Sequence, residues 1–229
     1  DFNVALGEGA LSTDTLGSKS VAIGVNALNE QNFTTATDSL NVAVGHLAGA
    51  AVTTGTQNTL IGGLAGDALT SGNKNVALGY QALTADTLGD RNVAIGNNAL
   101  ASQNFTTSTD SYNVAIGFNA GTSVTTGANN TILGGLAGDA LTTGQENIAM
   151  GRNALTADTK GQKSTALGNG ALQAQNFTTA TDSNNVAVGY IAGASVTTGI
   201  QNVIVGGLAG DSLTDADFNA AFGHAALSA

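Results

Sequence analysis

The stretch Asn3-Val4-Ala5-Leu6-Gly7 decides the fold, because close copies of it recur along the chain. Copies begin at positions 75, 147 and 219, so the chain consists of blocks of constant length that begin at these positions. Three further copies lie inside each block, and they begin at positions 20, 41 and 58 in the first. Thirteen copies result, and each signature Gly is followed three residues later by Ala. Self-similarity at a fixed period predicts a solenoid with one coil for each copy.

The repeats predict a single array over residues 1–229 rather than separate globular domains. Its superrepeats are 3–74, 75–146 and 147–218, with a partial fourth at 219–229. Asp1-Phe2-Asn3 repeats the phase of Asp217-Phe218-Asn219, as we expect of a segment cut from a longer array.

Composition narrows the fold class and the partners. The chain has 32 Gly, no Pro and 10% charged residues, which disfavours amphipathic surface helices. Its 42% hydrophobic residues fall into runs too short for a membrane span, so we expect no direct membrane insertion. A net charge of −10 provides no basic stripe for nucleic acid, and zero Cys excludes disulfides and thiolate metal sites.

Each signature reads as a short β-strand. In Val4-Ala5-Leu6, two bulky residues flank a small one, which is the period-two pattern of a strand with one large and one small face. We expect the large face to form the core, closed over by a second apolar stretch such as Ala99-Leu100. Gly55 and its equivalents lie ten residues after a signature Gly, where the chain reverses and a positive φ is expected. The first signature position is Asn in eleven coils, which indicates either a ladder of side-chain amides or a simple turn residue.

The fourth coil of each block departs from this pattern. A large apolar residue replaces the small-face Ala at Leu60, Ile132 and Ile204. If the small face points outward, these three residues form a candidate subunit interface. Alternatively, each is covered by a neighbouring turn of its own chain.

The second coil of each block carries four extra residues, and these insertions are the candidate ligand-binding or subunit-packing loops. At about 4.8 Å per coil, successive insertions are about 19 Å apart, which places three Phe in a row along one edge. The row either binds a repetitive ligand by avidity or packs against a neighbouring subunit, and packing is the favoured reading. The candidate residues are Asn32, Phe33, Thr34 and Asp38, then Asn104, Phe105, Thr106 and Asp110, then Asn176, Phe177, Thr178 and Asp182.

No catalytic, cofactor or metal site is expected. His46 and His224 each follow a signature Gly, in a slot that elsewhere holds many residue types, and no repeated nucleophile or carboxylate accompanies them. The Gly-rich stretch ending at Asp67 is faintly similar to calcium-binding nonapeptides, but its Asp recurs only once in each block. We therefore expect a protein that is not an enzyme.

The segments Ser20-Val21-Ala22-Ile23-Gly24 and Asn92-Val93-Ala94-Ile95-Gly96, each followed by two residues and Ala, resemble the head repeat of YadA-type trimeric autotransporter adhesins. The resemblance covers nearly the whole chain. It implies an all-β chain folded as a left-handed parallel β-roll, three subunits side by side as a homotrimer, and an extracellular adhesive or fibre role. The repeats are longer than is typical of that family, and similar longer repeats occur in bacteriophage tail fibres.

The expected function is therefore a structural and adhesive segment of an extracellular fibre, on a cell surface or a virion. Its expected partners are copies of itself and a host-surface protein or glycan. One alternative is the shaft or receptor-binding segment of a bacteriophage tail fibre. Another is an ice- or crystal-surface binder, suggested by Thr pairs such as Thr53-Thr54 that recur every fourth coil.

Overall fold

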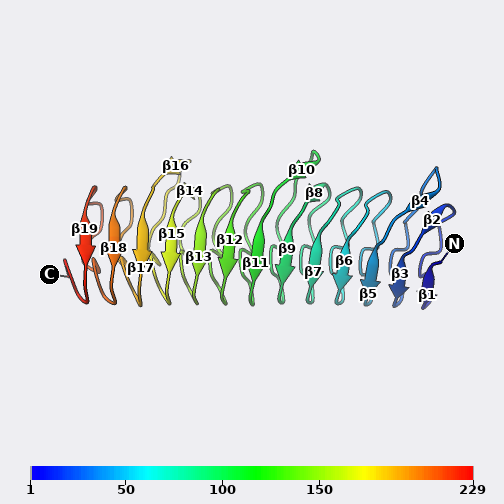
Figure 1. Ribbon diagram of the computed structural model, residues 1–229, viewed down its shortest axis with the longest axis horizontal. Helices are drawn as coiled ribbons and strands as arrows, with labels where there is room; N and C mark the ends of the chain where they lie inside the picture. Colours follow the sequence, from blue (N-terminus) through cyan, green and yellow to red (C-terminus); the bar gives the residue numbers. More distant parts are fainter. Residues whose placement is uncertain (1, 229) are drawn as a thin grey trace. The chain divides into compact units, whose positions relative to one another are not determined.

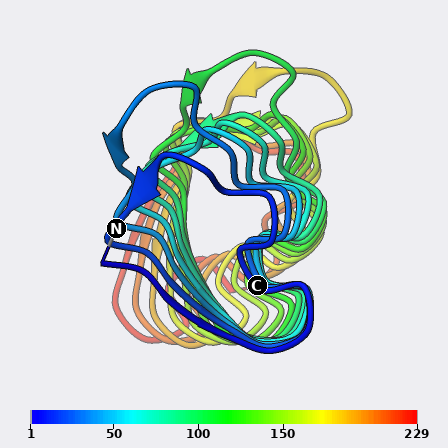
Figure 2. The ribbon, with the colours of Figure 1, turned by 90° about the vertical axis from the view of Figure 1, so that its right-hand side faces the viewer.

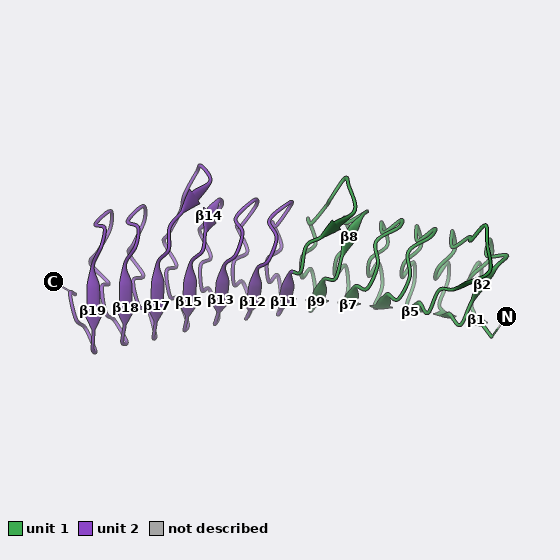
Figure 3. Cartoon of the chain, turned by 45° about the horizontal axis from the view of Figure 1, so that its top comes forward, with its two compact units in different colours: residues 1–112 green, residues 113–229 purple. Residues whose placement is uncertain are grey.

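The computed structural model describes residues 2–228, so residues 1 and 229 of the expected array lie outside the described part. The chain divides into two compact units, Asp1–Tyr112 and Asn113–Ala229 (Figure 3). Each unit is a parallel β-solenoid, in which every turn of chain adds one short strand to a sheet (Figure 1). Residues 2–228 contain no helix, and hence no helix long and apolar enough to cross a membrane. The predicted all-β class and the thirteen coils are confirmed.

Unit 1 has six coils and unit 2 has seven. Within each unit, each signature strand pairs with that of the next coil as the spacing predicted, for example Val4 with Val21 and Val21 with Val42. The signature strands of unit 1 are β1 (Val4–Leu6), β3 (Val21–Ile23), β5 (Val42–Val44), β6 (Thr59–Ile61), β7 (Val76–Leu78) and β9 (Val93–Ile95). Those of unit 2 are β11 (Val114–Ile116), β12 (Thr131–Leu133), β13 (Ile148–Met150), β15 (Thr165–Leu167), β17 (Val186–Val188), β18 (Val203–Val205) and β19 (Ala220–Phe222). Two-residue strands form separate pairs beside the sheet: β2 (Gly17–Ser18) with β4 (Thr37–Asp38), β8 (Gly89–Asp90) with β10 (Thr109–Asp110), and β14 (Gly161–Gln162) with β16 (Thr181–Asp182).

The interior of each coil is lined by the small face of the strand, so the prediction that the bulky face forms the core is wrong. Ala43 and Ala77 are fully buried, whereas the flanking Val42 and Val44 are only half-buried. The opposite wall supplies the second apolar stretch as predicted, with Ala99 and Leu100 fully buried. A coil this thin has room for one small and one large side chain across its width. The Ala of the strand is the small one, and the Leu of the opposite wall is the large one.

Leu60, Ile132 and Ile204 lie in this interior with no exposed surface, so the prediction that they point outward to a subunit interface is wrong. They are covered by their own chain, which is the alternative reading. Gly49 and Gly66 make room for Leu60, since a Cβ on either Gly would stand within 2.8 Å of a Leu60 methyl group. Other coils carry Leu at the Gly49 position, as at Leu28 and Leu83. In the coil of Leu60, the large side chain therefore comes from the strand, whereas in the coils of Leu28 and Leu83 it comes from the opposite wall.

The signature Asn residues form a ladder that joins side chains mainly to backbone, and amide-to-amide bonds add to it where Asn92 donates to Asn75 at 3.2 Å and Asn219 to Asn202 at 2.9 Å. Asn58 donates from Nδ2 to the carbonyl of Gly72 at 2.8 Å, and its Oδ1 accepts the N–H of Asn75 at 2.9 Å. The same pattern joins Asn130 to Gly144 and Asn147. Each Asn therefore satisfies backbone groups of the next coil that the short strands leave unpaired.

The return-turn Gly residues are required for close approach, and the positive φ predicted for them is not found. A Cβ on Gly55 would lie 2.5 Å from the carbonyl oxygen of Gly72. Corners are instead turned by residues such as Leu47 and Gln57, whose φ values are 57° and 60°. Their N–H groups donate to Val25 and Ser39 of the preceding coil, which offsets the cost of the left-handed conformation.

Candidate functional site

The insertion loops project from the edge of the coils, before β4 and β10 in unit 1 and before β16 in unit 2 (Figure 2). Their Phe side chains do not form an exposed row. Phe33, Phe105 and Phe177 are only 6%, 7% and 7% exposed within the single chain. The prediction that these rings face a ligand or a neighbouring subunit is therefore wrong, because each ring is covered by its own chain and anchors the loop.

Other candidate residues of the loops remain at the surface. Asn32, Asn104 and Asn176 are exposed, and each accepts a hydrogen bond through Oδ1 from a Thr of the preceding coil, at 3.0–3.1 Å. Thr34, Thr106 and Thr178 are exposed. The loops thus keep a polar outer surface over an apolar anchor.

A carboxylate holds each insertion loop from beneath; it is buried at Asp86 and Asp158 and half-buried at Asp14, which accepts from Gly17 and Gln31. Asp86 accepts the N–H groups of Gly89 at 3.1 Å and Phe105 at 3.2 Å, and the Nε2 group of Gln103 at 2.7 Å. Asp158 does the same for Gly161, Phe177 and Gln175. Burial raises the pKa of Asp86 above its ordinary value of 3.8, against the opposing effect of these hydrogen bonds.

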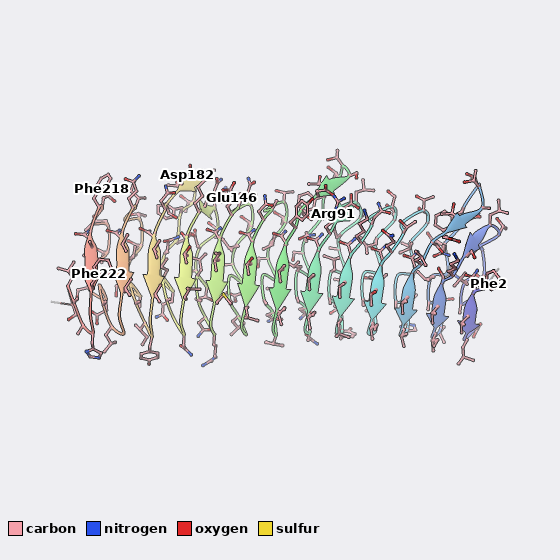
Figure 4. All side chains as sticks on the ribbon, viewed as in Figure 1. Phe2, Arg91, Glu146, Asp182, Phe218 and Phe222 are labelled. Atoms are coloured by element: carbon pink, nitrogen blue, oxygen red, sulfur yellow. The ribbon has the colours of Figure 1, made fainter. Side chains whose placement is uncertain are left out.

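The Asp that ends each insertion forms an ion pair with a basic residue of the preceding coil. Lys19 reaches Asp38 at 2.6 Å, and Lys163 reaches Asp182 at 2.5 Å. Arg91 pairs with Asp110, and its guanidinium carbon lies 5.6 Å from the centre of the Tyr112 ring. Figure 4 shows Arg91 close to the β10 loop. Because these pairs are exposed, each contributes little to the stability of the chain. They join the end of each insertion loop to the preceding coil.

Unit 1 contains a polar groove of about 340 Å³ bounded by the ends of its two insertion loops. Asp38 and Asp110 form the two walls, and the floor comes from the three coils between them. Asn73, Lys74 and Asp90 are among the floor residues. The groove is largely polar, because every lining residue carries a polar or charged side chain.

The outer face of the sheet in each unit is uncharged and mostly apolar, with Thr at positions 59, 131 and 165. We define the outer sheet face as the first and third residues of each signature strand, none of which is buried and none of which is charged. In unit 1, outside the first coil, Leu78 is among the most exposed residues of this face, at 42%. In unit 2, Leu133, Ile148, Met150 and Val203 are also exposed, and Phe222 lies on β19 (Figure 4).

In the described part of the chain, the His and Asp residues that could serve a catalytic or metal site are not gathered into one. His46 and His224 are exposed, as predicted for their slot, and so are Tyr80 and Tyr190 at equivalent positions. Among residues 2–228, no group of three or more His, Cys, Asp or Glu side chains is placed to hold a metal ion. Asp67 and Asp139 accept hydrogen bonds from Thr84 and Thr156 of the next coil. These two Asp residues join coils.

The first Thr of each pair behind the ice-binding alternative is bonded within the chain. Thr53 donates its hydroxyl to the carbonyl of Thr70, and Thr70 donates to that of Thr87, both at 3.1 Å. Thr125 and Thr142 repeat the arrangement in unit 2. A hydroxyl that bonds its own backbone is not free to match a water lattice.

Sequence reasoning missed the groove floor, although a signal for it exists. Four of the six Lys and Arg residues stand directly before the first signature position: Lys19, Lys74, Arg91 and Lys163. Three of these pair with the Asp that ends an insertion, whereas Lys74 belongs to a coil without one. In a chain with so few basic residues, their repeated occurrence directly before the signature indicates a specific role for this corner of the coil.

The chain matches no protein-family model, and no curated protein or solved structure is significantly similar to it.

Proposed function

We propose that this chain is a structural and adhesive segment of an extracellular fibre, on a cell surface or a virion, in which identical copies pack by their outer sheet faces. The observation that carries the proposal is the uncharged and mostly apolar character of that face in each unit. The chain as a whole has a net charge of −10, so its charged residues are placed elsewhere. Contiguous apolar surface of this extent favours association in water.

The occupant that fits this face is another copy of the same chain. Each strand adds one row of apolar side chains to the face, and the rows repeat at the spacing of the coils, about 4.8 Å. A partner with the same repeat can therefore contact every row in register. A globular partner with irregular spacing would meet only a few. Closed symmetric assembly then covers the face of every copy.

Three copies and a left-handed roll are the assembly that the resemblance to YadA-type head repeats implies. In that arrangement the outer sheet faces lie toward the common axis, and the insertion loops, on another edge of the coil, remain available. The stack of coils provides stiffness, and the repeated edges present binding groups at fixed spacing. Both features suit attachment of a fibre to a surface.

The proposal is tested by sedimentation of the purified chain and of a face variant. Leu78→Asp with Ile95→Asp puts two charges into neighbouring rows of the outer sheet face, and we expect the trimer to dissociate while the β-sheet circular dichroism persists. The control, Tyr80→Asp with Asn97→Asp, changes the charge similarly at exposed positions two residues further along the chain, beyond the ends of the two strands. It should leave the trimer intact. A wild-type chain that sediments as a monodisperse monomer would sink the proposal.

A further inference from the structure

The groove between the insertion loops of unit 1 contains one basic side chain that is not neutralised. Arg91 is paired with Asp110. Lys74 is exposed and forms no ion pair with any residue in 2–228. An ammonium on the floor of a groove carries donors for an anionic ligand.

The carboxylates around Lys74 are occupied by groups of the protein. Asp90, 8% exposed, accepts the N–H and Nδ2 groups of Asn73 at 2.6 and 3.1 Å through Oδ1. Its Oδ2 accepts the Ser108 hydroxyl at 2.9 Å. Because Asp90 is held by these donors, Lys74 stays available to solvent.

The walls of the groove suit hydroxyl groups better than further negative charge. Asp38 and Asp110 stand at its two ends, each with its partner cation already in place. Their remaining lone pairs accept hydrogen bonds, but they repel a multiply charged anion such as phosphate. Arg91 is fixed by Asp110 and by the Tyr112 ring, so that wall is preorganised.

We propose that this groove binds a carboxylated saccharide, with Lys74 bonded to the sugar carboxylate and the wall carboxylates accepting from sugar hydroxyls. Its volume of about 340 Å³ lies within the range of small-molecule sites. A peptide fits less well, because the polar lining offers no apolar pocket in which to anchor a side chain. The inference deepens the adhesive part of the proposed function, on which it rests, by naming its ligand class.

The second unit supplies a matched substitution. The residue one block after Lys74 is Glu146, which occupies the same kind of corner, with φ of 57° against 59°. Each donates its N–H across to the preceding coil, Lys74 to Thr56 and Glu146 to Ala128. Lys74→Glu therefore places at this corner a residue that the repeat already accepts, and it should fold.

The test is binding of the labelled full chain to an array of sialylated, uronic-acid-containing and neutral oligosaccharides, followed by titration with sialyllactose and lactose. We expect retention on carboxylated sugars alone, and a loss of about tenfold or more for Lys74→Glu, the effect of removing one charge-assisted hydrogen bond. The sialylated and uronic-acid arms identify the source of the carboxylate. Lys160→Glu, an equal change of charge outside the groove, should bind like the wild type.

Equal binding by wild type and Lys74→Glu would overturn the inference, as would preferential Lys74-dependent binding of a tetraglutamate peptide. Sedimentation of the same samples separates the two proposals. A trimer that binds no carboxylated sugar contradicts the groove inference alone. A monomer that binds in a Lys74-dependent way contradicts the assembly alone.

Discussion

At the scale of single residues, neighbouring glycines of the signature have unequal roles. Gly62 adopts φ of +131°, and a Cβ there would stand 2.5 Å from the carbonyl oxygen of Gly79. Gly63 has no such φ, and its nearest contact for a Cβ is the Tyr80 ring at 3.5 Å. Only the first position requires glycine, although both residues are invariant in the fourth coil of every block.

Gly62→Ala should therefore lower the free energy of unfolding by about 3 kcal/mol or more, as the combined cost of backbone strain and overpacking against backbone. Gly63→Ala should leave it unchanged or raise it by up to about 1 kcal/mol, through the entropy of the unfolded chain. Urea unfolding followed by circular dichroism measures both. Equal destabilisation by the two variants would contradict this assignment.

At the scale of the element, the insertion coil depends on a buried carboxylate. The pKa of Asp86 is raised by burial, so the folded chain binds this proton more tightly than the unfolded chain. Its contribution to stability is fully present below the unfolded pKa, near 3.8, and is lost as the pH rises through the higher folded pKa.

Asp86→Asn should remove this contribution, because an amide does not titrate. The Asn Oδ1 can still accept from Gly89 and Phe105, while the bond from Gln103 is lost at a cost of about 1–3 kcal/mol. The free energy of unfolding of wild type minus that of the variant, measured by urea titration at a series of pH values upward from about pH 3, below the unfolded pKa, should fall as the pH rises. A difference that increases with pH would show that the hydrogen bonds outweigh burial.

The period of the elements is predictable from sequence, but the direction of each side chain is less so. Val42-Ala43-Val44 alternates in the same way whichever face is inside, so its pattern alone does not identify the core. The deciding signal lies elsewhere in the coil: Leu60 appears in the blocks together with Gly49 and Gly66, where other coils have Leu. A large-for-small exchange across two walls indicates that both positions face the same interior.

The position of the insertion loops could be predicted from the sequence, but the exposure of their individual side chains could not. Four extra residues per block pointed to the loops before β4, β10 and β16, and the structure places exposed polar groups there. Burial of Phe33 could not be deduced, since an aromatic in a polar insertion suits an exposed anchor equally well. The groove depends on Lys74, which lies midway along the sequence between Asp38 and Asp110 and far from both. Only the stacking of coils brings such distant positions together.

At the scale of the whole molecule, charge and apolar surface have opposite effects on assembly. Each copy carries −10, so the proposed trimer would accumulate like charge, while the outer sheet face proposed to join the copies has no charged residue. Added salt screens the repulsion without weakening apolar contacts, because the Debye length falls from about 10 Å at 0.1 M to about 3 Å at 1 M. Cooling weakens the apolar contribution.

The dissociation constant of the trimer should therefore decrease when NaCl is raised from about 0.1 to 1 M, the interval over which screening shortens threefold, and increase on cooling. Saccharide binding through Lys74 should show the reverse salt dependence, since it joins opposite charges. Sedimentation equilibrium and sugar titration on one preparation measure both. If salt dissociated the trimer, ion pairs rather than the apolar rows would hold the copies together, and the outer sheet face would lose its role.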